Sequence, residues 1–215
     1  MKKIKFLLIS FMISFWSFNL YATDRTMASG YPKSNFHTKN IMKFIDEVKA
    51  NTSVNINLNP NDTLIKLDAI KTSLQRGQIP IGEIRFGIYG NEDPMYILAG
   101  LPFIAPDYAS AWLLKEVKHE YLQNLFNKKG LRILYTSPWP GQGFYTKTPV
   151  NGVSDFKGKK LRIYSTATQQ MGTMLGFNAT ILPFAEIPQA FSTGLIEALF
   201  TSCLLYTSDA ADEHS

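Results

Sequence analysis

The chain has 215 residues, of which 45% are hydrophobic, and a formal net charge of +5. This length can bury a sizeable core, either as one domain or as parts of two. The basic residues are spread along the chain, and nucleic-acid binding requires a clustered basic patch, so the charge pattern argues against a nucleic-acid partner.

Both ends are expected to lie outside the fold. Residues 1–22 begin with three lysines, continue with an apolar run and reach the small residue Ala22. This pattern is typical of a cleaved secretory signal peptide, since a membrane anchor needs roughly 20 apolar residues. An uncleaved anchor is the alternative.

Residues 203–215 interrupt the apolar pattern with "CLLYTSDAADEHS". This stretch resembles a translated sequencing adapter, so we predict a non-native tail on a chain truncated near Ser202; a natural polar tail is the alternative. Cys203, the single cysteine, falls in the tail, which leaves the mature part without a disulfide or a thiol nucleophile. His37 and His119 lack metal-ligand spacing, so no metal site is predicted.

Residues 23–90 are predicted to alternate strands and helices. Strands are expected at Arg25–Tyr31, Val54–Pro60 and Ile79–Gly90. Two helices lie between them, the second capped by Asn61 or Asp62. Their apolar faces are expected to be Ile41, Phe44, Ile45 and Val48, then Leu64, Leu67, Ile70 and Leu74. This order predicts a parallel sheet with right-handed crossovers.

The next segment joins two units. Asp107 is expected to cap a helix that ends at Gly130, with an apolar face formed by Leu114, Val117, Tyr121 and Leu125. A strand at Leu131–Ser137 then marks the crossing into the second unit. Residues 23–130 are therefore predicted to form a first α/β lobe and residues 131–202 a second one, both incomplete.

The second lobe again alternates strands and helices. Strands are expected at 143–147, 161–164, 178–184 and 195–200, with helices around Met171, Met174 and Leu175 and around Pro188, the latter ending at Gly194. The fold class is therefore α/β, with two lobes that are each a mainly parallel sheet flanked by helices.

Arg162 is the first candidate ligand-binding residue because it interrupts the apolar strand "LRIY". Side chains alternate along a strand, so Leu161 and Ile163 can serve the core while Arg162 faces elsewhere. Ligands of open α/β sheets bind beyond the carboxyl ends of strands, where a guanidinium can grip a carboxylate with two hydrogen bonds. A structural salt bridge with Asp155 or Glu186 is the alternative.

Other candidates lie where strands end or where polar and aromatic side chains combine. Gln can donate and accept hydrogen bonds, and Tyr offers an apolar wall with a hydroxyl, although an aromatic cluster with Phe144 is a competing explanation. Trp139 is expected to shape the cleft or hinge. The further ligand-binding candidates are Gln142, Tyr145, Tyr164, Thr201, Tyr31, Asn35 and Asn91.

Enzymatic activity is not predicted. No G-x-S-x-G nucleophile elbow occurs, and "GYG" and "GQG" do not open a helix with a following Lys-Ser/Thr pair, as a phosphate-binding loop would. We therefore expect a binding protein without a cofactor.

The run "DFKGKKLRIYS…TQQMGTMLGFNATILPFAEIPQAFSTGLIEALFTS" resembles the second lobe of the DctP-like periplasmic receptors of tripartite ATP-independent periplasmic (TRAP) transporters. Upstream, "NIMKFIDEVKANT", "SLQRGQIPIGEI" and "LAGLPFIAPDYASAW" resemble the first lobe, so the likeness covers Thr26 to Ser202. It departs from the family at Glu197, where Asp is frequent, at Thr201, where many members have a ligand-binding Asn, and at Gln142–Phe144, where many have another Arg.

The resemblance implies a two-lobed periplasmic receptor that closes on a small organic acid and delivers it to a membrane permease. It also favours Arg162 as the carboxylate ligand, assisted by first-lobe groups. A sensory or scaffolding extracytoplasmic domain with the same fold is the alternative function.

Overall fold

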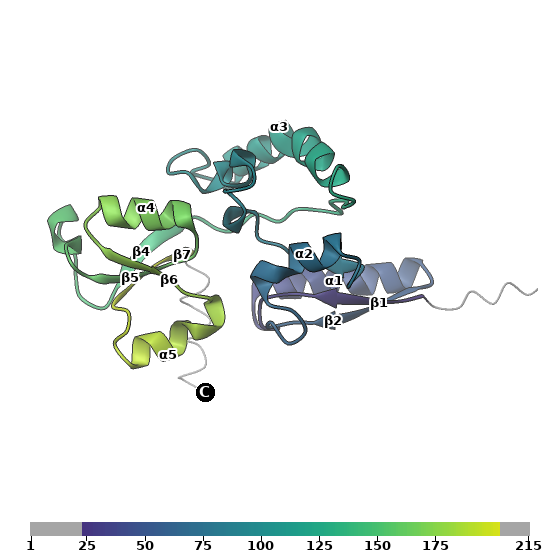
Figure 1. Ribbon diagram of the computed structural model, residues 1–215, viewed down its shortest axis with the longest axis horizontal. Coiled ribbons are helices and arrows are strands. Elements are labelled where there is room, and N and C mark those ends of the chain that lie inside the picture. Colours follow the sequence, from purple (N-terminus) through teal and green to yellow (C-terminus); the bar gives the residue numbers. More distant parts are fainter. Residues whose placement is uncertain (1–22, 203–215) are drawn as a thin grey trace, which may run out of the picture.

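The computed structural model describes residues 23–202, which form two α/β lobes around separate sheets (Figure 1). The strand order is β2-β1-β3 in the first sheet and β4-β7-β5-β6 in the second. The predicted signal peptide and the predicted tail lie outside the described residues.

The first lobe has the predicted βαβαβ order. Its elements are β1 (Thr23–Ala28), α1 (Phe36–Asn51), β2 (Val54–Asn59), α2 (Ile70–Gln75) and β3 (Ile81–Gly82). Both β2 and β3 pair with β1 in parallel. Helix α1 covers one face of this sheet through Ile41, which packs with Met27, and α2 covers the other through Ile70, which packs with Ala28.

Two predictions for this lobe are wrong in extent. Strand β3 has only two residues instead of the predicted 79–90, because β1 ends at Ala28 and offers no partner beyond it. The chain continues in short 3-10 helices at 86–88, 94–96 and 98–100. The helix after β2 begins with a 3-10 turn at Leu67–Ala69 instead of at 61–62, because Asn61 and Asp62 have left-handed φ angles of 56° and 59°.

Helix α3 (Tyr108–Asn127) begins at the predicted cap, where Asp107 Oδ1 accepts a hydrogen bond from Ser110 N at 2.7 Å. Its predicted apolar face is wrong for Val117 and Tyr121, which are 72% and 49% exposed, whereas Leu125 packs on the core as predicted. The buried face, Lys118, Leu122 and Phe126, is rotated by one residue because the helix packs on an aromatic cluster that includes Tyr96.

After Gly130 the chain crosses toward the second lobe. Residues 131–137, predicted as a strand, pair with no strand of the described part of the chain. This segment is therefore a connection rather than a sheet element.

The second lobe contains β4 (Gln142–Thr146), β5 (Lys160–Ile163), α4 (Thr166–Met174), β6 (Asn178–Ile181), α5 (Ile187–Ser192) and β7 (Ala198–Ser202). Strand β5 runs parallel to β6 and β7, whereas β4 pairs with β7 in the antiparallel sense. Helices α4 and α5 lie on opposite sides of the sheet (Figure 1). The mainly parallel α/β architecture predicted for each lobe is therefore confirmed.

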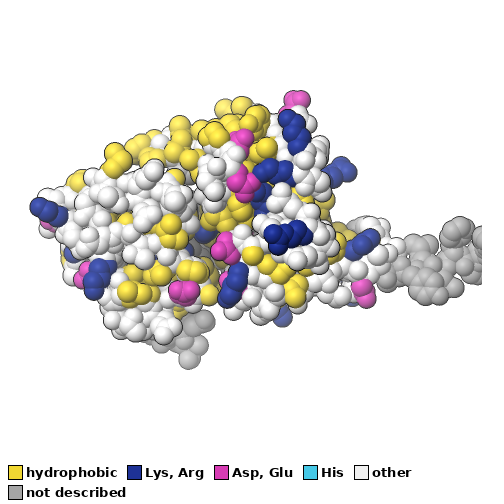
Figure 2. All heavy atoms as spheres, viewed as in Figure 1, with side chains coloured by type: hydrophobic (Ala, Val, Ile, Leu, Met, Phe, Trp, Pro, Cys, Tyr) yellow, Lys and Arg dark blue, Asp and Glu magenta, His cyan; other side chains and the backbone are white. Residues whose placement is uncertain are grey.

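Hydrophobic side chains also gather on the outer side of α3 (Figure 2). Tyr108, Trp112, Leu113 and Val117 are each more than half exposed there. Within residues 23–202, no helix combines the length and the hydropathy that crossing a bilayer requires.

Candidate ligand-binding site

Arg162 lies on β5 with its side chain on the face opposite the main core of the second lobe. Its neighbours Leu161 and Ile163 are fully buried in that core, as their alternation predicted. Arg162 is only 1% exposed, and its Nε donates to the carbonyl oxygen of Leu182 at 3.0 Å. No carboxylate among residues 23–202 forms an ion pair with it, so the alternative salt bridge with Asp155 or Glu186 is absent there.

A second guanidinium reaches the same place from the first lobe. Arg85 follows β3, and its Nη2 donates to the carbonyl oxygen of Tyr164 at 3.1 Å. The Cζ atom of Arg85 lies 5.0 Å from the centroid of the Tyr164 ring, and that of Arg162 lies 5.8 Å from it. Both cations therefore gain some stabilisation from one phenol ring at the boundary between the lobes.

No described anion forms an ion pair with either guanidinium, and Arg162 is almost completely removed from solvent. Burial, and secondarily the charge of Arg85, lowers the pKa of Arg162 to about 10. Arg85 Nε is buried and makes no hydrogen bond within residues 23–202. Burying unpaired charge costs free energy, and an anionic ligand between the guanidiniums would recover it through charge-assisted hydrogen bonds.

Tyr31 adds a buried hydroxyl to this site. It follows β1, is 2% exposed, and its hydroxyl makes no hydrogen bond of acceptable geometry with any described residue. Burial raises the pKa of Tyr31 to about 12, although the charges of Arg85 and Arg162 and a poorly aligned contact with the Arg85 side chain act in the opposite direction. The hydroxyl is therefore a neutral donor near both guanidiniums.

Aromatic side chains enclose Tyr31. The rings of Trp139 and Phe184 pack against the Tyr31 ring in T-shaped arrangements, at centroid distances of 5.1 and 5.9 Å. His37, at the start of α1, meets Trp139 edge to face at a centroid distance of 4.3 Å and is 6% exposed. Its Nε2 has no hydrogen-bond partner among the described residues. Trp139 thus links the two lobes at the site, consistent with the cleft-shaping role expected for it.

Ser29 and Glu83 lie on the first-lobe side of this cluster. The Ser29 hydroxyl donates to Glu83 Oε2 at 2.5 Å and accepts from the backbone N–H of Tyr31 at 3.3 Å. Burial raises the pKa of Glu83 to about 7 despite the Ser29 hydrogen bond. The site therefore combines two cationic groups with a carboxyl group that no described cation neutralises.

The predicted second-lobe residues are divided between the two faces of the sheet. Leu199 pairs with Arg162 across β7 and β5 and with Tyr145 across β4. Tyr145 and Thr201 consequently share the face of Arg162, and Thr201 is 1% exposed. Gln142 lies on the opposite face, where it is exposed and donates to the carbonyl oxygen of Pro140 at 2.9 Å.

The predicted asparagines have other surroundings. Asn35 caps α1 by accepting from His37 N at 2.9 Å, so its Oδ1 has a structural role. Asn91 is exposed on a turn next to Glu92, whose carboxylate binds Lys71 and Lys129. The structure therefore brings Tyr31, Tyr164 and Arg162 together but gives no such placement for Asn91.

Sequence reasoning missed Arg85, Glu83 and Ser29. The signal was available, because "GEIRF" places the charged residues Glu83 and Arg85 in an apolar segment, just as "LRIY" places Arg162 in one. Interpreting residues 79–90 as one long strand hid that the chain leaves the sheet at Gly82.

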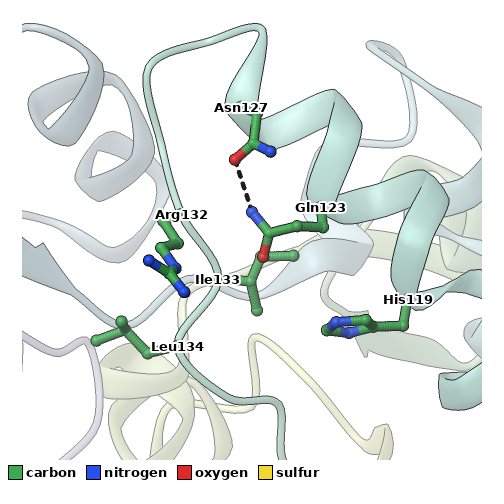
Figure 3. A pocket seen from close by; sticks show the side chains of 6 residues that line it. All are labelled: His119, Gln123, Asn127, Arg132, Ile133 and Leu134. Atoms are coloured by element: carbon green, nitrogen blue, oxygen red, sulfur yellow. Dashed lines mark hydrogen bonds between the residues drawn. The ribbon is translucent and has the colours of Figure 1, made fainter.

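A separate pocket lies between α3 and the segment 132–134 (Figure 3). Its volume is about 480 Å³, and it is lined by His119, Gln123, Asn127, Arg132, Ile133 and Leu134. It contains none of the predicted site residues. Within the described part of the chain, no group of three or more His, Cys, Asp or Glu side chains could hold a metal ion.

Known proteins resemble this chain in sequence. The family model described as "Bacterial extracellular solute-binding protein, family 7" (DctP) matches residues 27–212. A "Solute-binding protein" from Albidiferax ferrireducens is 26% identical over 186 residues, which cover 84% of this chain and 54% of that protein. The chain thus spans about half the length of this curated relative.

Solved structures show the same architecture. DctP7 of Bordetella pertussis, an extracytoplasmic solute receptor binding pyroglutamic acid, is 38% identical with a TM-score of 0.85; the match covers 88% of this chain and 64% of that one. A marine-metagenome TRAP solute-binding protein specific for pyroglutamate is 35% identical with a TM-score of 0.80, covering 84% of this chain and 60% of that one.

Proposed function

Because this chain belongs to family 7 of the bacterial extracellular solute-binding proteins, the DctP family, we propose that it is a TRAP-transporter receptor that binds a small carboxylic acid between its lobes. Membership confirms the resemblance found in the sequence. It also confirms the expectation of a receptor rather than an enzyme, because the family and the similar structures are solute-binding proteins.

The observation that carries this proposal is the pair of uncompensated guanidiniums. A carboxylate between Arg162 and Arg85 would take hydrogen bonds from both lobes at once, with the Tyr31 hydroxyl as a further donor. Charge-assisted and bidentate hydrogen bonds to a carboxylate are the strong ones, and they strengthen as water is excluded.

The same pair couples binding to lobe closure. The bond from Arg85 to the Tyr164 carbonyl crosses from the first lobe to the second, so the described arrangement is one in which the lobes touch. A ligand held by both guanidiniums would favour this arrangement over an open one. The population can shift only by as much as the ligand's affinities for the two arrangements differ.

Pyroglutamate is the first ligand to test, since the similar structures at 38% and 35% identity are pyroglutamate receptors. The proposal extends to a periplasmic location, reached through a cleaved signal peptide at residues 1–22, and to delivery of the acid to a TRAP permease. The alternative function is that of a sensory or scaffolding extracytoplasmic domain that binds the same acid.

The direct test is a calorimetric titration of the full-length protein with pyroglutamate and with pyroglutamamide, in which a neutral amide replaces the carboxylate. The proposal expects binding of the acid and at least about a tenfold loss for the amide, because hydrogen bonds to charged groups contribute more than neutral ones. Equal binding of both compounds would contradict a carboxylate receptor.

A further inference from the structure

Glu83 and Arg85 follow β3 with one residue between them. They are two residues apart in extended backbone, since Glu83 N donates to the Ala28 carbonyl at 2.9 Å and Arg85 has φ −99° and ψ 111°. Ile84 between them packs into the apolar clusters of the first lobe. Side chains alternate along an extended segment, so the carboxyl group and the guanidinium are expected on the face away from Ile84.

Hydrogen bonds connect these groups to the Arg162 site. The Ser29 hydroxyl donates to Glu83 and accepts from the backbone N–H of Tyr31. Arg85 donates to the carbonyl oxygen of Tyr164, whose ring also lies against Arg162. The charges of Arg85, Glu83 and Arg162 all affect the pKa of the Tyr31 hydroxyl. The site therefore has a donor side, made by the guanidiniums and the Tyr31 hydroxyl, and an acceptor side, made by Glu83.

The Glu83 carboxyl group can accept a further hydrogen bond. Ser29 donates to Oε2 of Glu83, and no residue within 23–202 donates to Oε1. The charge of Glu83 raises the pKa of two other groups, Tyr31 and Tyr135. Burial without a cationic partner raises the pKa of Glu83 to about 7, so an added hydrogen-bond donor would stabilise its ionised form.

We infer that Glu83 is a specificity-determining residue that accepts a hydrogen bond from an N–H group of the ligand, so that the site selects small acids carrying both a carboxylate and an N–H donor. This inference rests on the proposed function, in which the arginines hold the carboxylate. An acid without the donor leaves Glu83 uncompensated, and a second carboxylate in its place would be repelled.

A matched ligand pair tests this. Pyroglutamate has a ring N–H, and 3-oxocyclopentane-1-carboxylate has a CH₂ group in that position while it keeps the ring carbonyl and the carboxylate. Titrations of the full-length protein at pH 8, where Glu83 is mainly ionised, should show at least about a tenfold preference for pyroglutamate. Glu83→Gln should reduce that preference to below about threefold, because a neutral acceptor makes a weaker hydrogen bond.

A control separates a ligand contact from a general effect of removing a carboxylate. Glu186→Gln replaces an exposed carboxylate elsewhere in the second lobe and should retain the preference. Equal binding of both acids by the unmodified protein would overturn the inference and leave the proposed function standing. An unchanged preference in Glu83→Gln would also overturn it, and binding of neither acid would overturn both.

Discussion

Arg85 and Arg162 come from different lobes and flank the ring of a single residue, Tyr164, with their Cζ atoms 5.0 and 5.8 Å from its centroid. The charge of Arg85 contributes to the lowered pKa of Arg162, so the two cations repel each other. Repulsion between groups that the fold holds together is relieved by an anion placed between them. Ligand binding and contact between the lobes therefore depend on the same pair of arginines.

Arg162→Lys should weaken binding of a carboxylate ligand at least about tenfold, because an ammonium is a point charge that cannot reproduce the two parallel hydrogen bonds of a guanidinium. Calorimetric titration of the full-length variant measures the loss. Arg25→Lys, the same exchange at an exposed position of β1, is the matched control and should bind normally. If Arg162→Lys bound the acid with wild-type affinity, the proposed role of Arg162 in binding the carboxylate would be wrong.

Tyr31→Phe should change stability and affinity in different directions. The Tyr31 hydroxyl is buried without a described partner, so its removal relieves a desolvation cost, and the thermal midpoint of the ligand-free protein should equal or exceed that of wild type. Affinity for the acid should fall by about tenfold if the hydroxyl donates to the carboxylate.

Tyr96→Phe is the matched control for this variant, because the Tyr96 hydroxyl is also buried without a described partner but belongs to the aromatic cluster under α3. It should leave affinity unchanged. A destabilised Tyr31→Phe protein with normal affinity would show that the hydroxyl supports the fold instead of the ligand.

His37 should make the fold acid-sensitive. Burial lowers the pKa of His37 from 6.5 to about 4, so the unfolded chain binds a proton more readily than the folded one. The contribution of His37 to stability is then complete above pH 6.5 and is lost as the pH falls toward 4, by on the order of 3 kcal/mol in total. His37→Phe should keep the ring packing against Trp139 and flatten this part of the stability curve.

The comparison must be between variant and wild type, because Glu83 acts in the opposite sense. Its raised pKa means that its contribution is present below pH 4.5 and declines as the pH rises through about 7. Denaturant melts at pH 4.5, 5.5 and 7.5 measure the difference, and the exposed His119→Gln is the control. A stability difference between His37→Phe and wild type that does not vary with pH would contradict the lowered pKa.

Periodicity predicted most of the elements correctly where local patterns and packing agree. Leu161 and Ile163 alternate with Arg162 in the sequence, and they do so in the structure because β5 has helices on both faces. The helix of Ile41 is likewise packed on the side that its pattern predicts.

The errors arise where long-range packing decides. The face of α3 is set by the aromatic cluster around Tyr96, which draws Lys118 inward and leaves Val117 exposed, and no local pattern encodes that rotation. The extent of β3 depends on the end of β1, its neighbour in space. The first-lobe half of the site was missed for the same reason, since Arg85 becomes a site residue only where the lobes meet.

Gly30→Ala should disturb the site through the backbone. Gly30 joins Ser29 to Tyr31, and a Cβ atom there would lie 2.5 Å from Leu67 Cβ, which the 3-10 turn after Asp62 holds in place. Neither atom can rotate away, so the chain must shift. We expect a loss of about 1–3 kcal/mol in the free energy of unfolding, together with weaker ligand binding.

Gly87→Ala is the control for this substitution, because a Cβ atom at Gly87 meets nothing within 4 Å and its φ is not left-handed. Thermal melting and calorimetric titration of both variants measure the two effects. A Gly30→Ala protein that loses stability but binds normally would show that Tyr31 and Ser29 tolerate displacement, and the tight positioning argued for the first-lobe half of the site would be wrong. A loss of affinity in Gly30→Ala alone would instead tie ligand binding to the close approach between β1 and Leu67.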